Sequence, residues 1–256
     1  MIQRQWSAFC SALTLLTRIP VNGLFHYRPQ DASNSWIYFP FVGAFIGILS
    51  ASILFPALPH FPSSLKILIV MLTSILLTGA LHEDGLGDTV DGLFGGTTPE
   101  KRLEIMKDSR IGSYAAISLW FLLFAKFYLL QSLLLIDPVL TITSLVIAHC
   151  VSRSCTTLLM ALLPYVSHSG TKSMDYIQNG SLFKSLIAIT IAINITAVLL
   201  PTSFIPILMT SLLITLLTGL LYRQKIGGIT GDTLGATQQL VELALYGAIL
   251  FSNFSI

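Results

Sequence analysis

The sequence predicts an all-α protein, a polytopic transmembrane helical bundle of about six to eight spans, and two observations lead to this fold class. Hydrophobic residues make up 54% of the 256 residues and charged residues only 10%, with a mean hydropathy of +0.79. A soluble domain normally carries about 25% charged residues. Several apolar runs are also long enough to cross roughly 30 Å of hydrocarbon as helices. A β-barrel would alternate apolar and polar residues along each strand, and these runs do not alternate.

Seven apolar runs define the expected spans. In chain order they cover residues 36–55, 65–81, 111–136, 138–163, 182–200, 204–222 and 234–251. The segment from Trp6 to Arg18 is too short to span, and its polar residues recur every three or four positions, which favours a helix lying in the membrane interface. A cleaved signal peptide is the alternative, although Arg18-Ile19-Pro20 is a poor cleavage region. We expect a single integral membrane catalytic domain over residues 1–256.

Basic residues concentrate on one side of this expected bundle. They are Arg4, Arg18, Arg28, Lys101, Arg102, Lys107, Arg110, Lys172, Lys184, Arg223 and Lys225. The loops on the opposite side offer little beyond Lys66. The positive-inside rule places the basic side in the cytoplasm, so we expect a multi-pass protein of the bacterial cytoplasmic (inner) membrane. The net charge of +2 is too small to indicate nucleic-acid binding.

Acidic residues are concentrated in one short segment. Seven of the twelve carboxylates fall between Glu83 and Asp108, and Asp84, Asp88 and Asp91 stand at i, i+4 and i+7. A helix would carry these three on one stripe, where they would repel one another and be costly to desolvate. A bound cation removes both penalties, and carboxylates without thiolates favour Mg²⁺ or Mn²⁺. The sequence predicts a divalent-metal site at the mouth of the bundle, on the stripe of Asp84, Asp88 and Asp91.

Two further segments bear on phosphate chemistry. Thr98 and Pro99 predict the start of an amphipathic helix that continues to Arg110 on the cytoplasmic membrane surface, and a solvated connecting helix is the alternative interpretation. The run from Gly227 to Gly235 is rich in glycine, so its backbone can approach an anion. A helix beginning near Thr233 would direct free N–H groups and its positive dipole end at phosphate. Read alone this second signal is weak, because glycine-rich turns connect many helices.

Two cations fall inside expected spans. Lys126 and Arg153 should each face the bundle interior or a cavity, because a charge exposed to lipid is costly. The sequence leaves open whether they bind an anionic substrate or pair with an internal carboxylate such as Glu242. Arg153 is the better ligand candidate because it lies nearer the expected cytoplasmic end. For His82, beside the acids, the roles of metal ligand, base and bystander all remain open.

The combination of carboxylates, basic residues and a glycine-rich helix start favours transfer of a phosphate-linked group between a bulky or lipophilic substrate and a polar one. Three groups of membrane enzymes share such a plan: CDP-alcohol phosphotransferases, aromatic prenyltransferases and cobalamin synthases. The segment His82-Glu83-Asp84-Gly85-Leu86-Gly87-Asp88-Thr89-Val90-Asp91-Gly92 closely resembles the cobalamin synthase signature. Further segments that resemble this family are 17–21, 39–43, 104–112, 151–153 and 231–236, in order over nearly the whole chain. The chain lacks the Asp-Gly-x-x-Ala-Arg motif of the first group, and only one of the two Asp-rich motifs of the second is obvious.

The resemblance implies a transferase of cobalamin biosynthesis. The family joins adenosylcobinamide-GDP to α-ribazole or its 5′-phosphate, releases GMP and uses Mg²⁺. It implies that Asp84, Asp88 and Asp91 hold one or two Mg²⁺, with Glu83 as outer support or as a fourth metal ligand. It also implies that Asp108 or Asp232 completes the metal shell or accepts the hydroxyl proton. The expected phosphate-binding groups are Lys107, Arg110 and Arg153, on the leaving GMP, and the loop at Gly228, Gly231 and Thr233.

A cation-coupled transporter is the alternative from another functional class. Transporters usually contain internal repeats with broken helices near the midplane, and the acidic motif has no obvious second copy in the chain. The expected partners are therefore the two small-molecule substrates and the lipid bilayer. Whether the chain forms a homo-oligomer is left open by the sequence.

Overall fold

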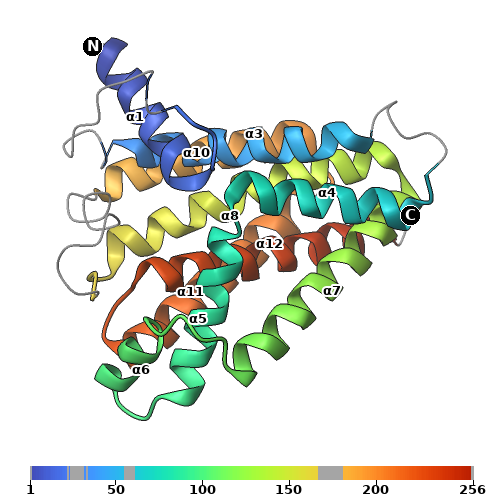
Figure 1. Cartoon of the computed structure of the whole chain (residues 1–256). Helices are drawn as coiled ribbons and strands as arrows, with labels where there is room; N and C mark the ends of the chain where they lie inside the picture. The colour runs from blue at the N-terminus through green and yellow to red at the C-terminus, as the bar shows by residue number, and fades with distance from the viewer. Residues whose placement is uncertain are drawn as a thin grey trace.

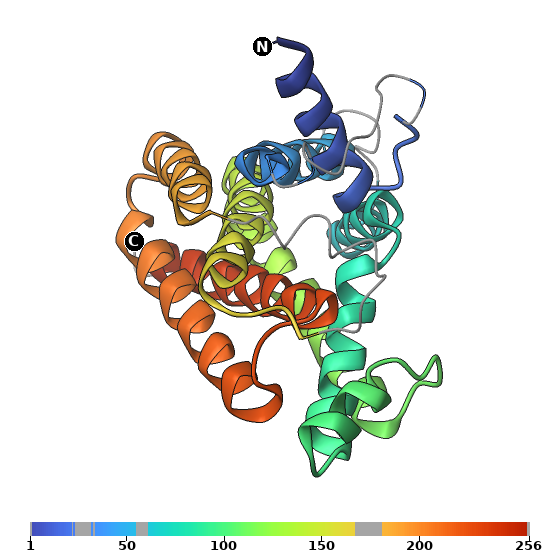
Figure 2. The same ribbon diagram turned by 90° about the vertical axis from the view of Figure 1, so that its left-hand side faces the viewer.

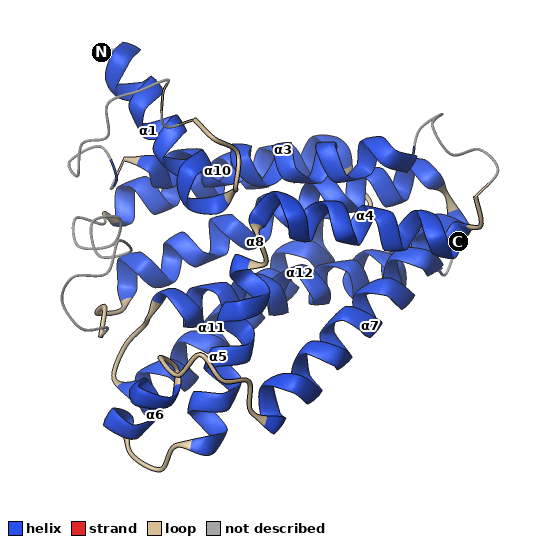
Figure 3. Cartoon of the chain, in the orientation of Figure 1, coloured by secondary structure: helices blue, strands red, loops and turns tan. Residues whose placement is uncertain are grey.

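The computed structural model describes residues 2–21, 23, 32, 34–54, 61–166 and 181–254. In these ranges the secondary structure is helical apart from an isolated bridge between Tyr165 and Ile229, and Figure 3 shows the helices in blue. The elements are α1 (Ile2–Leu16), η1 (Ser35–Tyr38), α3 (Phe39–Ala51), η2 (Ser52–Leu54), α4 (Ser63–Thr78), α5 (Leu81–Gly95), α6 (Pro99–Ile105), α7 (Ser113–Ile136), α8 (Pro138–Leu162), α10 (Leu182–Leu199), α11 (Phe204–Ile226) and α12 (Gly231–Phe254).

The predicted polytopic helical bundle is confirmed. Six helical segments of the described chain are long and apolar enough to cross a membrane: Ser35–Leu54, Ser113–Ile136, Pro138–Leu162, Leu182–Leu199, Phe204–Ile226 and Gly231–Phe254. The bent pair of α4 and α5 raises the number to seven if it counts as one span. Helix α8 packs against α3, α10 and α12, and the end-on view of Figure 2 shows it in yellow-green near the centre.

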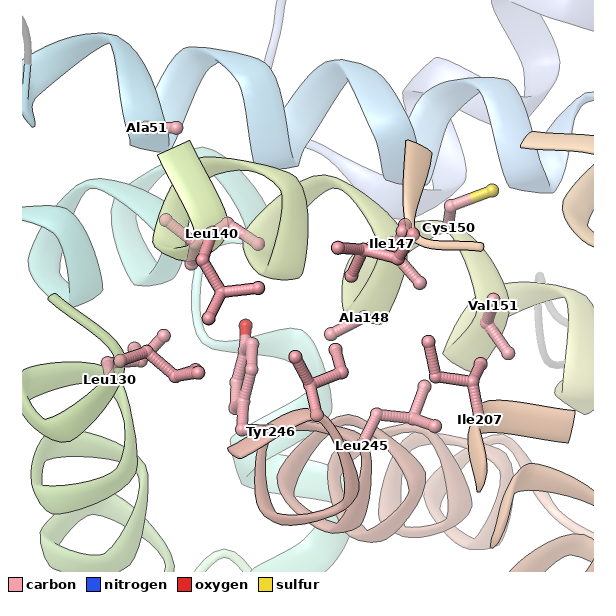
Figure 4. Packing of buried hydrophobic residues seen from close by; sticks show 14 of the residues in the cluster. Ala51, Leu130, Leu140, Ile147, Ala148, Cys150, Val151, Ile207, Leu245 and Tyr246 are labelled. Atoms are coloured by element: carbon pink, nitrogen blue, oxygen red, sulfur yellow. The ribbon is translucent and has the colours of Figure 1, made fainter. Parts of the chain in front are cut away.

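Small residues and apolar side chains hold α8 in this central position. A Cβ atom at Gly43 of α3 would lie 2.2 Å from the carbonyl oxygen of His149, so only glycine permits this close contact. On the other side of α8, Leu140 and Ala148 lie near Leu245 and Tyr246 of α12, as Figure 4 shows. The two contacts fix α8 between α3 and α12.

The chain bends sharply between α4 and α5. Gly79 and Ala80 both have left-handed backbone conformations, with φ of 65° and 58°, and the two helix axes meet at 84°. The span expected over 65–81 therefore ends at Thr78. In Figure 1, α5 turns away from the direction of α4 and runs towards α6. Helix α5 therefore lies across the bundle rather than along it. It is also short and carries four carboxylates, which does not suit a membrane span.

One of the expected helix boundaries is wrong, and another holds to within two residues. The surface helix begins as predicted, since the Thr98 hydroxyl accepts a hydrogen bond from the Lys101 N–H, but it ends at Ile105 rather than Arg110. It ends early because Asp108 accepts the backbone N–H of Arg110 in a local turn that competes with the helix. Helix α12 begins at Gly231, two residues before the predicted start near Thr233, and Thr230 caps it by accepting the Thr233 N–H at 3.2 Å.

Two of the segments expected on the basic side, α6 with its flanking loops and the loop after α11, meet at one end of the bundle. Arg102 Nη1 of α6 donates to the carbonyl oxygen of Lys225 at the end of α11, at 3.0 Å. At the same end, the backbone N–H of Arg18 after α1 donates to the Leu77 carbonyl oxygen just before the bend. The third expected basic loop, around Lys172, lies outside the described residues.

Candidate active site at the acidic helix

Helix α5 packs closely on the first turn of α12. A Cβ atom at Gly85 would lie 2.9 Å from the carbonyl oxygen of Asp232, and one at Gly235 would lie 3.3 Å from the Cα of His82. These two glycines therefore let the helices approach until their backbones touch. The contact brings Asp232, which is distant in sequence, to the acidic stripe of α5.

The carboxylates at this contact repel one another. Asp88 is half-buried, and no hydrogen bond reaches its carboxylate from the described part of the chain. Burial, together with the nearby charges of Asp232, Asp84 and Asp91, raises the pKa of Asp88 from its ordinary value of 3.8 to about 7. The stripe predicted from the sequence is thus a real concentration of negative charge, and Asp232 belongs to it.

Asp91, the last carboxylate of this stripe, caps the start of α7. Its Oδ2 accepts the N–H of Gly112 at 2.7 Å and its Oδ1 accepts the N–H of Ala115 at 2.9 Å. These are free N–H groups at the start of α7, and Gly112 has no side chain with which to cap them. A Cβ at Gly112 would also lie 2.6 Å from Asp91 Oδ1, so the cap requires glycine there. We therefore assign Asp91 to capping α7 rather than to metal binding.

Glu83 faces the bundle interior instead of the stripe. Its Oε1 accepts a hydrogen bond from Gln239 Nε2 at 3.0 Å. Gln239 in turn contacts Lys126, whose Nζ lies 2.7 Å from Glu242 Oε1. Gln238 donates to the other oxygen of Glu242 at 2.6 Å. For Lys126, the choice left open by the sequence is resolved in favour of pairing with Glu242, and Glu83 belongs to this buried network.

Arg153 is buried beside the network. Only 1% of its surface is exposed, and its Nη1 donates to the His149 carbonyl oxygen at 3.1 Å. His149 Nδ1 lies 3.2 Å from Glu242 Oε2, so the His149 ring is held inside the bundle by this contact. The Nε atom of Arg153 has no hydrogen-bond partner among the described residues.

A pocket lies where α1, α3, α5, α8 and α12 meet, with a cavity volume of about 150 Å³. Its polar lining residues are His82, Asp84, Arg153, Thr156 and Asp232, and its remaining lining residues are Leu15, Leu16, Phe39, Leu81, Met160, Gly231, Leu234 and Gly235. The Nδ1 atom of His82 is buried and has no partner in the described chain. The pocket therefore combines carboxylates, unpartnered buried nitrogen atoms and an apolar wall.

Other predicted site residues lie away from this pocket. Asp108 pairs with Arg110 through a 2.9 Å hydrogen bond from Nε, and these contacts lower the pKa of Asp108 to about 2. Such a carboxylate is a poor proton acceptor, and neither residue lines the pocket. Lys107 lies close enough to Asp232 to interact with it electrostatically.

The glycine-rich segment is largely occupied by its own contacts. The N–H of Ile229 donates to the Pro164 carbonyl oxygen at 2.8 Å, and the N–H of Thr230 donates to Thr233 Oγ1 at 2.8 Å. Gly228 packs against Pro164, where a Cβ would lie 2.1 Å from its carbonyl oxygen. Of the three phosphate-binding positions predicted here, only Gly231 lines the pocket, because Gly228 and Thr233 serve packing and capping.

The donor set fits a hard divalent cation. Among the described residues, no three His, Cys, Asp or Glu side chains are gathered tightly enough to enclose a metal on their own. Mg²⁺ does not need such a cage, because it keeps several waters and binds through one or two carboxylates plus substrate phosphates. Asp84, Asp88 and Asp232 present such carboxylates, and the mutual repulsion at Asp88 would be relieved by a cation.

The apolar wall of the pocket was not predicted. Leu15, Leu16 and Met160 gave no chemical signal in the sequence, since each follows ordinary helical spacing. Two indirect signals existed: Leu16 immediately precedes segment 17–21, and Phe39 begins segment 39–43. Both segments had been identified only as parts of a family resemblance, without a role.

Comparison with known proteins gives one consistent result. Residues 8–250 match the family described as cobalamin-5-phosphate synthase. The adenosylcobinamide-GDP ribazoletransferase of Shewanella frigidimarina is 39% identical over 253 residues, covering 98% of this chain and 97% of that protein. The enzyme of the same name from Shewanella oneidensis is 38% identical over 243 residues, covering 94% and 93%. No solved structure matches the chain significantly.

Proposed function

Because the chain belongs to the cobalamin-5-phosphate synthase family, we propose that it joins adenosylcobinamide-GDP to α-ribazole or α-ribazole 5′-phosphate and releases GMP. The chain is a transferase of nucleotide-loop assembly in cobalamin biosynthesis. The observation that carries the assignment of the site is the pocket that Asp84 and Asp232 line together with the buried cation Arg153.

The reaction exchanges a phosphoanhydride bond for a phosphate ester bond. The ribazole 3′-hydroxyl oxygen forms a bond to the phosphorus on the cobinamide side, and the bond from that phosphorus to the bridging oxygen of GMP breaks. The hydroxyl proton passes to a base, and GMP leaves with the bridging oxygen as part of its phosphate. We propose that Asp232 accepts this proton on one carboxylate oxygen and leaves the other for the metal, because it lines the pocket whereas Asp108 is exposed and held by Arg110.

A Mg²⁺ ion, when bound, supplies positive charge that stabilises the transferring phosphoryl group and the leaving phosphate. Asp84, Asp88 and Asp232 would hold it. Lys107 lies near Asp232 and is placed to attract the diphosphate of adenosylcobinamide-GDP at the mouth of the pocket. Arg153 binds a substrate phosphate from the inner end of the same pocket.

The site is proposed to face the cytoplasm from the bacterial inner membrane. The contact between Arg102 and the Lys225 carbonyl oxygen supports one shared end for the two basic loops, and the positive-inside rule gives that end its side. Single cysteines placed at Thr98 and Gln224 in a cysteine-free background should both be blocked by an impermeant thiol reagent from the cytoplasmic side. Labelling of the two positions from opposite sides would refute the arrangement.

Turnover can be tested with the protein in liposomes, adenosylcobinamide-GDP, α-ribazole and Mg²⁺, with GMP as the measured product. We expect GMP release that depends on both α-ribazole and Mg²⁺. Release that ignores α-ribazole would refute the transferase function, and flux of a substrate into sealed vesicles without GMP release would indicate a transporter.

A further inference from the structure

Side-chain hydrogen bonds tie helix α5 to its neighbours at two points in the described chain. Near its start, Glu83 Oε1 accepts a hydrogen bond from Gln239 Nε2 of α12 at 3.0 Å. Near its end, Asp91 accepts two N–H groups at the start of α7. Asp84 and Asp88 lie between these anchors, and no hydrogen bond from the described residues reaches either carboxylate. The two carboxylates that remain available to a cation are therefore flanked by two that neighbouring helices hold.

The first turn of α5 needs an anchor of this kind. The helix begins after the left-handed Ala80, and no side chain caps that start with a hydrogen bond. Its axis is bent by 84° from that of α4, so the preceding helix does not continue into α5 and fix its orientation. The contact between Gly85 and Gly235 lets α5 approach α12 closely, but it supplies no directional bond. Glu83 supplies that bond, one residue before Asp84.

The surroundings of Glu83 suit an anchor better than a metal ligand. Its Oε2 is buried, and Glu83 lines a cavity of about 20 Å³ together with Lys126, His149 and Glu242. The charges of Glu242 and Glu83 both act on the buried Arg153, and Lys126 Nζ lies 2.7 Å from Glu242 Oε1. Two formal negative charges thus balance two positive ones inside the bundle. The positive charges of Lys126 and Arg153 would repel a cation bound at Glu83.

We infer that Glu83 is a positioning residue of the active site: through Gln239 it fixes the first turn of α5, so that the adjacent Asp84 meets Asp232 in the pocket. The inference rests on the proposed function and specifies how the carboxylates of its site are held. It also removes Glu83 from the metal ligands, an option that the sequence left open. Misplacement of a functional group by about 1 Å can cost about 100-fold in rate, so loss of the anchor should be measurable.

Exchange of the two hydrogen-bonded partners is the direct test. Glu83→Gln removes the negative charge, and Glu83→Gln/Gln239→Glu restores it on the other side of the same contact. The measured quantity is the Mn²⁺ affinity by electron paramagnetic resonance, on nanodisc-held protein with adenosylcobinamide-GDP. Glu83→Gln should weaken this affinity at least about tenfold, as when support for a metal ligand is lost. The double variant should return to within about threefold of the wild-type affinity, because it keeps both the charge and the hydrogen bond.

Glu104→Gln is the matched control, because it makes the same substitution on α6 at a side chain that is 69% exposed and pairs with Lys101. It should leave the Mn²⁺ affinity unchanged. If the double variant bound Mn²⁺ as weakly as Glu83→Gln, Glu83 would be a metal ligand and the inference would be wrong. If Glu83→Gln lowered the midpoint of thermal unfolding but changed neither Mn²⁺ affinity nor kcat, the contact would serve stability alone and the inference would also be wrong.

Gln239→Leu tests the same contact without changing any charge, and so serves even if Glu83→Gln fails to fold. It keeps every carboxylate of α5 and removes the donor to Glu83. It should weaken Mn²⁺ binding at least about threefold and reduce turnover by a similar factor. Unchanged Mn²⁺ binding and turnover in Gln239→Leu would overturn the inference. Failure of the proposed function is distinguishable, since the wild-type protein would then release no GMP with α-ribazole, whatever the Mn²⁺ affinities of the variants.

Discussion

Replacement of Asp88 by asparagine separates a functional carboxylate from a structural one. Asn has nearly the same volume as Asp but lacks the charge that attracts Mg²⁺. No hydrogen bond reaches Asp88 in the described chain, and the charges of Asp232, Asp84 and Asp91 oppose its ionised form. Asp88→Asn should therefore remove repulsion from the folded protein and break no contact.

The expected magnitudes differ for activity and stability. Turnover should fall at least ~100-fold, or about 2.7 kcal/mol of transition-state stabilisation, as when one electrostatic partner of a reacting group is removed. The midpoint of thermal unfolding should stay the same or rise. Raised Mg²⁺ should recover part of the activity if the ion binds more weakly in the variant.

Asp91→Asn is the matched comparison on the same helix. It weakens the cap on α7, because an amide supplies only one acceptor oxygen for the N–H groups of Gly112 and Ala115. Loss of such a cap costs about 1–2 kcal/mol, so the unfolding midpoint should fall. GMP release and thermal unfolding would be measured on the same nanodisc preparation of each variant. A stable Asp88→Asn protein with near-normal turnover would refute the assignment of Asp88 to the metal site.

Three further outcomes follow from the structure. Lys126→Met should destabilise the protein by about 3–5 kcal/mol, because the buried Glu242 loses the ammonium group that lies 2.7 Å from it, and Lys126→Met/Glu242→Gln should recover much of the lost unfolding midpoint. Equal midpoints for the wild type and the single variant would contradict the pairing. The pKa of Asp88 is raised to about 7, so Mg²⁺ must displace a proton from this carboxyl group below that pH. The Mg²⁺ affinity measured by calorimetry should therefore weaken as the pH falls below about 7, by up to about tenfold per pH unit. Asp88→Asn should flatten this pH dependence. Asp108→Asn should reduce GMP release less than about threefold, because Asp108 pairs with Arg110 outside the pocket and an exposed ion pair contributes little to stability. A loss of activity comparable to that of Asp88→Asn would show that Asp108 belongs to the active site.

Local sequence patterns predicted the spans and the acidic stripe well. The apolar runs are longer than a membrane is thick, and helical spacing alone places Asp84 and Asp88 on one face. The bend after α4 was less visible, because it depends on Ala80 adopting a left-handed conformation that alanine rarely takes. That bend is what turns the stripe across the bundle and towards α12.

Contacts between distant segments decided which acidic residues remain available. Asp91 was expected beside the metal, but the uncapped start of α7 at Gly112 takes both of its oxygens. Glu83 was expected beside it too, but α12 presents Gln239 and draws Glu83 into the buried network. Asp232 was placed only as one of two alternatives, and the close contact at Gly85 brings it to the stripe. Sequence spacing carries no information about such partners.

Asp84, Asp88 and Asp232 are expected to bind together a divalent cation that also binds the substrate diphosphate. The most direct measurement is Mn²⁺ binding followed by electron paramagnetic resonance, on nanodisc-held protein with and without adenosylcobinamide-GDP. We expect the affinity for Mn²⁺ to rise when adenosylcobinamide-GDP is present. We expect it to fall at least about tenfold in Asp84→Asn, Asp88→Asn and Asp232→Asn but not in Asp108→Asn. Mn²⁺ binding that is unaffected by all three substitutions, or lost equally in Asp108→Asn, would contradict it.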